Sequence, residues 1–190
     1  IMRSVLGYTA ASRAAQGEGK AFEDATKYLV SNMLRSMAKK LEIEMIYGQM
    51  GYGTVASVST STVTITTSEW APGIWAGAEN MPIEIRNSAG STSRGETIIT
   101  GVDFSTKTLT LQAALVGVTA GDVIWHKGAY GNEFAGVHKI ISNTGSLFGI
   151  DASQFALWKG NSYGAGSAAL SFQKLQDAIA KAVEKGLDSD

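Results

Sequence analysis

The stretch that decides the fold is AFEDATKYLVSNMLRSMAKKLEIEMIY, residues 21–47. It contains neither glycine nor proline, and most of its residues favour a helix. Apolar residues recur in steps of three or four and so draw one stripe along that helix: Phe22, Ala25, Leu29, Met33, Met37, Leu41 and Met45. A helix of this length spans roughly 40 Å, about the width of a small domain. The pattern fits an ordinary core helix, and it also fits a spine that is longer than the domain it supports.

The sequence on either side of this helix is rich in small residues. We expect residues 1–20 to form an extended arm that leads into a joint at Gly17–Gly19. After the helix, the run GQMGYG at 48–53 predicts a helix end and a turn. It does not predict a nucleotide site, because its glycines follow a helix where a dinucleotide fingerprint would open one.

From residue 54 the apolar period changes from about 3.6 to 2, which indicates strands. The runs with this alternation are TVASVS at 54–59, TVTITT at 62–67, IEIR at 83–86, ETIITGV at 96–102, KTLTLQ at 107–112 and DVIWH at 122–126. Six short strands at this spacing predict a small antiparallel β-barrel or sandwich over 54–127. We expect Trp70, Trp75 and Trp125 to fill its core or to form a contact patch.

Residues 128–190 combine a broken, glycine-dense crossing with a final amphipathic helix. We expect that helix from Phe172 to about Lys185, with Ser171 as its cap and Gly186 as its terminator. Its apolar stripe is predicted to be buried and comprises Phe172, Leu175, Ile179, Ala182 and Val183. The sequence therefore predicts an α+β protein in which 54–127 is inserted between 21–53 and 128–190.

Composition excludes several kinds of function. The 190 residues include no cysteine, which rules out disulfides and cysteine nucleophiles, and the net charge of −1 gives no global attraction for nucleic acid. No apolar run is long enough to cross a bilayer, and residues 1–10 lack the apolar core of a signal peptide. We expect a soluble protein. Because the chain opens on Ile1, we also expect it to be a piece of a longer product.

No catalytic or metal site is predicted. His126 and His138 have no further ligand at metal-binding spacing, so we expect neither a metal nor a cofactor. Asp103, Asp122 and Asp151 are the carboxylates that a hydrolase could use, yet each lies where a turn explains it. We therefore expect a protein that is not an enzyme.

The block GVHKIISNTG at 136–145 is followed by FGIDAS at 148–153 and ALWKGN at 156–161. This order resembles the major capsid proteins of tailed bacteriophages, in which G-L-x-x-I-x-x-T-G, then G-I-D-x-S, then a W-W-R-like ending precede the helix of the next domain. Lys159 stands where that family often has Arg. The residues that carry the resemblance are Phe22, Gly136, Gly145, Gly149, Ile150, Asp151, Trp158 and Lys159.

The resemblance implies the shell fold that these phages share with herpesviruses and encapsulins. Its peripheral domain has a long spine helix, an extended loop reaches a neighbour, and an axial domain surrounds the symmetry axes. Against that pattern, 54–127 is an inserted β-barrel, and most of the axial domain is absent from these residues. The implied function is that of a self-assembling subunit of an icosahedral shell that is assembled in the host cytoplasm and encloses DNA.

The partners implied by the resemblance are further copies in capsomers and shells, scaffold, portal or decoration proteins, and packaged DNA, without a membrane. Basic residues slightly outnumber acidic ones before residue 50, so Lys39 and Lys40 are candidates for weak, non-specific DNA contact. An enzyme-loaded nanocompartment shares the same fold. The alternative function is a β-rich surface module that binds carbohydrate or protein through Trp70, Trp75 and Trp125, with a hydrolase as a third interpretation.

Overall fold

The computed structural model describes residues 19–142, 145–155, 158–166, 169–184 and 186, and the side chains from residue 27 onward. It divides into two compact units, Ile1–Met45 and Ile46–Asp190. Most of the predicted arm at 1–20 and the side chain of Phe22 lie outside this description. The mixed α+β class predicted from the sequence is confirmed.

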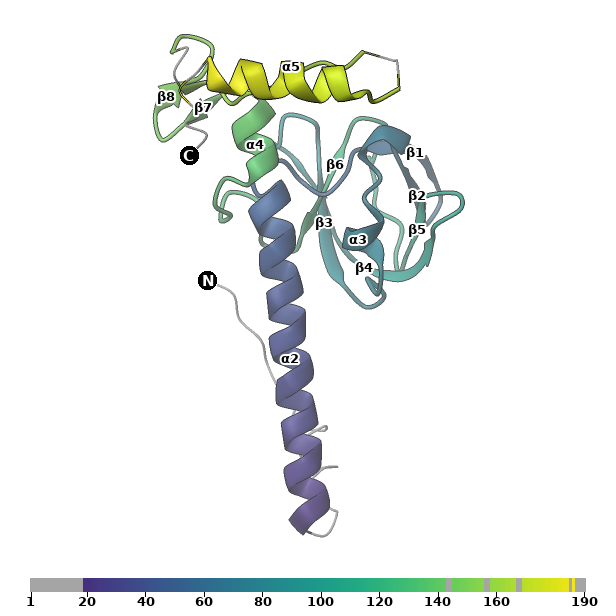
Figure 1. The fold of residues 1–190 in the computed structure, drawn as a ribbon. Helices are drawn as coiled ribbons and strands as arrows, with labels where there is room; N and C mark the ends of the chain where they lie inside the picture. The colour runs from purple at the N-terminus through teal and green to yellow at the C-terminus, as the bar shows by residue number, and fades with distance from the viewer. Residues whose placement is uncertain (1–18, 143–144, 156–157, 167–168, 185, 187–190) are drawn as a thin grey trace. The chain divides into compact units, whose positions relative to one another are not determined.

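Helix α2, Gly19–Tyr47, accounts for most of the described part of the first unit (Figure 1). It ends at the predicted residue, and it includes Gly19, the last residue of the predicted joint, while Gly17 and Glu18 lie outside the described residues. A single glycine costs a helix only about 1 kcal/mol, and the helix-favouring residues that follow outweigh it. Lys40 and Glu44 form an ion pair one turn apart at 4.0 Å. Among the described helices, none combines the length and apolarity needed to cross a bilayer.

The second unit contains a six-stranded antiparallel sheet, and each strand coincides with a predicted run. The strands are β1 (Val55–Ser59), β2 (Thr62–Ile65), β3 (Pro82–Arg86), β4 (Ser93–Asp103), β5 (Thr108–Leu111) and β6 (Val123–His126). Their order in the sheet is β1-β2-β5-β4-β3-β6. A 3-10 turn, η1 (Thr67–Glu69), and a short helix, α3 (Pro72–Trp75), join β2 to β3 and were not predicted.

The sheet curls into a half-barrel. We use the name half-barrel for residues 54–127. Register shifts in β3 and β4 mark bulges, which bend strands and increase their twist (Figure 1). The curl brings the two edge strands together at one end, where Thr54 bridges to Val123 and the Val55 amide donates to the Asp122 carbonyl at 2.8 Å. Side chains alternate between the two faces of β2: Val63 and Ile65 point inward and are buried, while Thr62 and Thr64, on the other face, are partly exposed.

Most of the core lies inside the half-barrel. Its fully buried side chains include Trp75, Ile83, Ile85, Ile99, Leu109 and Ile124. Trp125 is also buried, so core filling is confirmed for two of the predicted tryptophans. Trp70 is half-buried and stacks on Trp75, with ring centroids 6.1 Å apart.

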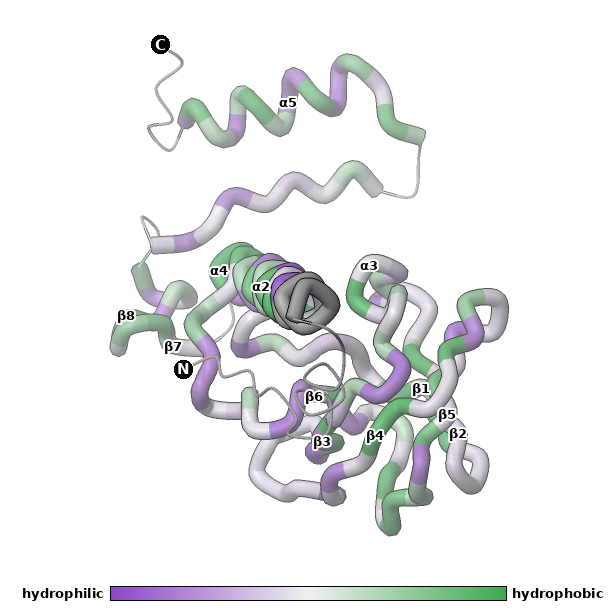
Figure 2. The backbone as a smooth tube through the Cα atoms, turned by 90° about the horizontal axis from the view of Figure 1, so that it is seen from below, coloured by the Kyte–Doolittle hydropathy of each residue, from purple (hydrophilic) through white to green (hydrophobic). Residues whose placement is uncertain are grey.

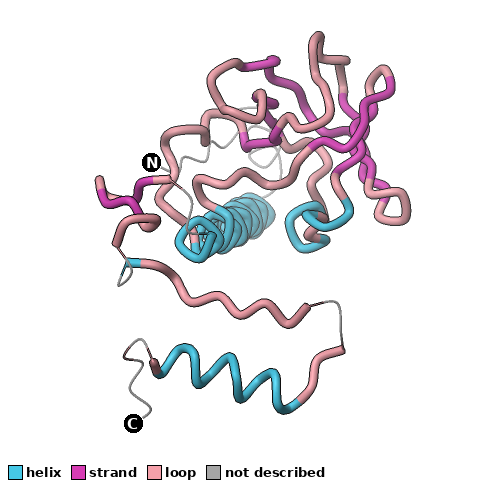
Figure 3. The backbone as a smooth tube through the Cα atoms, turned by 90° about the horizontal axis from the view of Figure 1, so that it is seen from above, coloured by secondary structure: helices cyan, strands magenta, loops and turns pink. Residues whose placement is uncertain are grey.

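The remaining elements are short, apart from the final helix. They are α4 (Val137–Ser142), β7 (Ser146–Leu147), β8 (Ile150–Asp151) and α5 (Phe172–Val183), joined largely by loops (Figure 3). The Ser171 side chain caps α5 by accepting a hydrogen bond from the Lys174 amide, and Gly186 has a φ of 89°. The predicted cap and left-handed terminator are both confirmed.

Candidate assembly surface

The residues that carry the capsid resemblance build turns and close backbone approaches. Gly136 lies against the end of α2, and its amide donates to the Gly48 carbonyl at 2.9 Å. A Cβ at residue 136 would lie 2.5 Å from the Gly48 nitrogen and 2.7 Å from the Ile46 oxygen. Backbone atoms cannot move aside as a flexible side chain can, so this position requires glycine.

Gly149 belongs to a tight hairpin between β7 and β8. Phe148 and Gly149 have φ angles of 53° and 79°, and they separate the paired residues Leu147 and Ile150. Positive φ at both central residues defines a type I′ turn, whose twist matches that of the strands it joins. The turn places Phe148 at its tip, with 84% of the residue exposed.

The other motif residues follow the hairpin or precede it. Asp151 accepts a hydrogen bond from the Ser153 amide at 2.8 Å, and hydrogen bonds from Ser153 lower the pKa of Asp151. Trp158 is partly exposed and meets Phe148 edge to face at 6.5 Å. The backbone of Gly145 adopts the left-handed conformation, with a φ of 70°, and the Lys159 side chain is exposed. These motif residues therefore shape a local surface.

Gly160 contributes to the same region but is not among the predicted residues. A Cβ there would lie 3.0 Å from the Ile140 oxygen, so the chain passes close to α4. The only signal in the sequence is a glycine directly after Trp158-Lys159, which without a structure looks like any loop glycine.

Three polar side chains of helix α5 bond to the segment that precedes it. Lys174 Nζ donates to the Ala165 carbonyl at 2.5 Å, and Lys181 Nζ donates to the Ser162 carbonyl at 2.9 Å. The Tyr163 hydroxyl donates to Asp177 at 3.2 Å, and the pKa of Tyr163 is raised by desolvation and then by that carboxylate. Residues 162–165 therefore lie along the polar face of α5. Figure 3 shows the loop before α5 running beside the helix.

Of the five residues predicted for the apolar stripe of α5, Ala182 is half-buried; the other four are exposed and share one face at helical spacing, and we call them the α5 stripe: Phe172, Leu175, Ile179 and Val183. Phe172 is 74% exposed and Ile179 is 60% exposed. The prediction that this stripe is buried is therefore wrong for the single chain. Periodicity identifies an apolar face but not its cover, and α5 packs extensively against no other helix or strand among the described residues. Figure 2 shows the alternation of apolar and polar residues along α5.

Further exposed apolar side chains belong to the stretch of sequence that follows the half-barrel and precedes α5. They are Phe134, Val137, Ile140, Ile141, Phe148, Phe155, Trp158, Tyr163 and Leu170. We define the C-terminal segment as residues 134–183, which contain both this group and the α5 stripe. Isolated exposed hydrophobic residues are normal, but a concentration of this kind marks an interaction surface.

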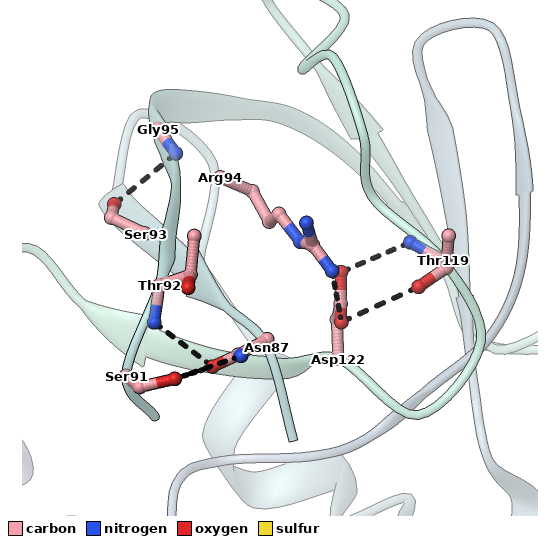
Figure 4. Close-up of polar contacts among 8 residues, drawn as sticks. All are labelled: Asn87, Ser91, Thr92, Ser93, Arg94, Gly95, Thr119 and Asp122. Atoms are coloured by element: carbon pink, nitrogen blue, oxygen red, sulfur yellow. Dashed lines mark hydrogen bonds and ion pairs between the residues drawn. The ribbon is translucent and has the colours of Figure 1, made fainter. Parts of the chain in front are cut away.

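The hydrolase candidates lie in separate turns. Asp122 is buried. It accepts hydrogen bonds from Arg94 Nε at 2.9 Å and from the Thr119 amide at 3.0 Å, and these bonds stabilise the turn before β6 (Figure 4).

The other two carboxylates also bond within turns. In the β4–β5 turn, hydrogen bonds from the Ser105 and Thr106 side chains lower the pKa of Asp103 to about 2. Asp151 bonds within its own turn. In the described part of the chain, the partners of these carboxylates support structural roles, as the turn interpretation predicts.

The two histidines also lie apart. His126 is buried beside Tyr52, with ring centroids 4.2 Å apart, whereas His138 is exposed in α4 and meets Tyr47 edge to face. The residues that the structure describes contain no group of three or more His, Asp or Glu side chains placed to hold a metal ion. The Tyr52 hydroxyl donates to the buried Glu133 carboxylate, which ties the turn after α2 to the loop before α4.

Comparison with protein-family models and with curated proteins gives no match. The evidence for a function therefore comes from the surface described above and from the motif residues.

Proposed function

We propose that this chain is a structural subunit of an icosahedral viral shell, of the kind formed by tailed-phage major capsid proteins, and that it acts by self-assembly without catalytic turnover. The observation that carries the proposal is the orientation of α5. Its polar side chains bond to residues 162–165, while its apolar stripe is exposed. Burying a large apolar side chain contributes about 1.5–3 kcal/mol, so a neighbouring copy that covers four of them gains substantially.

Two features add support. The motif residues from Gly136 to Lys159 occur in the order expected for the capsid family. The 29-residue α2 has the length of a shell spine, and it carries exposed apolar residues such as Leu34, Leu41 and Met45. In this proposal the half-barrel is an insertion into a peripheral domain, and the enclosed cargo is DNA.

The test is sedimentation velocity with negative-stain electron microscopy of the chain, expressed alone and together with its neighbouring genes. Closed shells or capsomer-sized rings are the expected result. A persistent monomer at high concentration under both conditions would contradict the proposal.

A matched pair of variants locates the assembling surface. Ile179→Glu introduces a charge into the α5 stripe and is expected to reduce the assembled fraction by about tenfold or more, because the charge would have to be buried. Val116→Glu makes the same kind of change at a residue of the half-barrel that is 92% exposed, and it is expected to leave assembly intact. Equal loss in both variants would exclude a specific role for α5.

A further inference from the structure

A pocket of about 720 Å³ lies in the second unit and is independent of the α5 stripe. Its lining comes from the turn after α2, from η1 and the residues after it, from the β3–β4 turn, from β6 and from α4. The volume falls within the range of small-molecule sites. Because five separate stretches of chain converge on it, its shape depends on the fold of the whole unit.

One wall of the pocket is an ordered aromatic surface. Tyr130 is half-buried, meets Trp125 edge to face at 5.1 Å, and has the Arg86 guanidinium 4.1 Å from its ring centroid. Arg86 Nε in turn donates to the Gly90 carbonyl at 2.8 Å. A Cβ on Gly90 would lie 2.2 Å from the Tyr130 hydroxyl, so glycine at this turn is what lets the ring lie across it.

A second group of lining residues is also held in place by contacts within the unit. Trp70 stacks on Trp75, and the neighbouring Glu69 accepts a hydrogen bond from the Thr54 amide at 2.8 Å. In the turn after α2, the Gln49 amide donates to the Glu133 carboxylate at 3.0 Å. A site whose walls are already ordered spends less free energy on ordering when a ligand binds.

The chemistry of the lining indicates the ligand. The lining contains one acidic side chain, Glu69, one lysine, Lys139, and one histidine, His138. It contains no arginine. That composition does not suit a phosphate or a polyanion, which needs several cations. The lining combines the half-buried aromatic residues Trp70 and Tyr130 with short polar side chains, including Asn87, Ser88 and Ser68. The indole nitrogen of Trp125 is buried and has no acceptor among the described residues.

We propose that this pocket binds a neutral saccharide. A sugar ring has an apolar C–H face that packs on an aromatic ring, and hydroxyls around its edge that both donate and accept hydrogen bonds. Trp70 and Tyr130 supply the aromatic faces, and the exposed Ser88 hydroxyl supplies hydrogen bonds at the β3–β4 turn, while the Asn87 side chain holds that turn by bonding to Ser91 and to the Thr92 amide. The site differs from the tryptophan patch suggested by the sequence, because Trp75 does not line it and Tyr130 does.

The test is ligand-observed NMR together with tryptophan fluorescence of the full chain, using cellotetraose, maltotetraose, chitotetraose and mannotetraose. A sulfated tetrasaccharide and an extended apolar peptide serve as comparison probes. Saturable binding of at least one neutral saccharide is expected. No saturation by any neutral saccharide at roughly 10 mM, or saturation by the peptide or the sulfated probe alone, would overturn the proposal.

Two variants locate the binding. Ser88→Arg places a long side chain at the exposed rim of the pocket without touching the core, and it is expected to weaken binding about tenfold or more. Thr92→Arg, in the same hairpin but outside the lining, is the matched control and should bind as the unmodified chain does. Trp70→Phe should retain part of the affinity, because it keeps an aromatic face.

Undiminished binding in Ser88→Arg would show that the saccharide binds elsewhere. Assembly does not enter into this experiment, so a failure to bind saccharide leaves the shell proposal as it stands, and the reverse also holds.

Discussion

Most large apolar residues of the half-barrel are buried, whereas most of those in the C-terminal segment are exposed. In the half-barrel, strand residues such as Ile83, Ile85 and Ile99 are fully buried, and its exposed large hydrophobic residues are Val58, Phe104 and Val116. In the C-terminal segment the large apolar residues are mostly exposed, and the described strands there pair only as the small β7–β8 hairpin. The half-barrel stabilises itself, while the C-terminal segment gains its stability from a neighbour in the proposed shell.

The largest expected effect comes from removing a core side chain. Ile99→Ala in β4 should lower the free energy of unfolding by about 2–5 kcal/mol, because it leaves a cavity in the half-barrel. Ile179→Ala in α5 should change it by no more than about 0.5 kcal/mol in the monomer, because that side chain is already exposed. Urea denaturation of both variants measures the difference. Equal losses would contradict the comparison.

A second prediction concerns the attachment of the C-terminal segment to the turn after α2. Gly136→Ala should destabilise the chain by about 1–3 kcal/mol, because the new methyl group meets backbone atoms of Ile46 and Gly48. Gly73→Ala in α3 has nothing within 4 Å of the added Cβ and is the matched control. Thermal unfolding followed by circular dichroism distinguishes them. An unchanged melting temperature in Gly136→Ala would mean that the close approach is not required.

A third prediction concerns the buried carboxylate of the half-barrel. Asp122→Asn removes the charge that pairs with Arg94, and it should cost about 1–3 kcal/mol because the Arg94 guanidinium is only partly exposed. Asp103→Asn changes a fully exposed turn and should cost less. The two variants can be ranked by their denaturation midpoints. The reverse ranking would show that the Arg94–Asp122 pair contributes little.

The smallest effect is the pH dependence of the β4–β5 turn. The pKa of Asp103 is lowered from 3.8 to about 2, chiefly by the Ser105 side chain, so the folded state favours the ionised form. Its contribution to stability is present above pH 3.8 and is lost as the pH falls toward 2. Asp103→Asn should therefore flatten the dependence of the melting temperature on pH in this window. A slope equal to that of the unmodified chain would contradict the assignment.

Sequence patterns predicted the parts of this fold that depend on local periodicity. The six strands follow from alternation, as at Val63 and Ile65, and the end of α2 follows from the loss of helix formers at Gly48. The cap at Ser171 and the terminator at Gly186 follow from backbone chemistry that a single residue determines. These features require no knowledge of distant contacts.

The two candidate sites, the α5 stripe and the aromatic pocket, could not be predicted from the sequence. Periodicity shows that α5 has an apolar face, but only the hydrogen bonds of Lys174 and Lys181 show that this face is turned away from residues 162–165. The aromatic pocket likewise joins Trp70 to Tyr130, two residues that are 60 positions apart with no motif between them. Such a juxtaposition comes from the curl of the sheet, which strand patterns do not specify.

The most direct test of the account is hydroxyl-radical footprinting of the assembled and dissociated chain, read by mass spectrometry. If α5 is an assembly surface, Phe172 and Ile179 in the α5 stripe and Phe148 on the hairpin tip become strongly protected on assembly, with little change at Phe104 and Val116 in the half-barrel. Protection confined to the half-barrel, or equal labelling of the α5 stripe in both states, would contradict it.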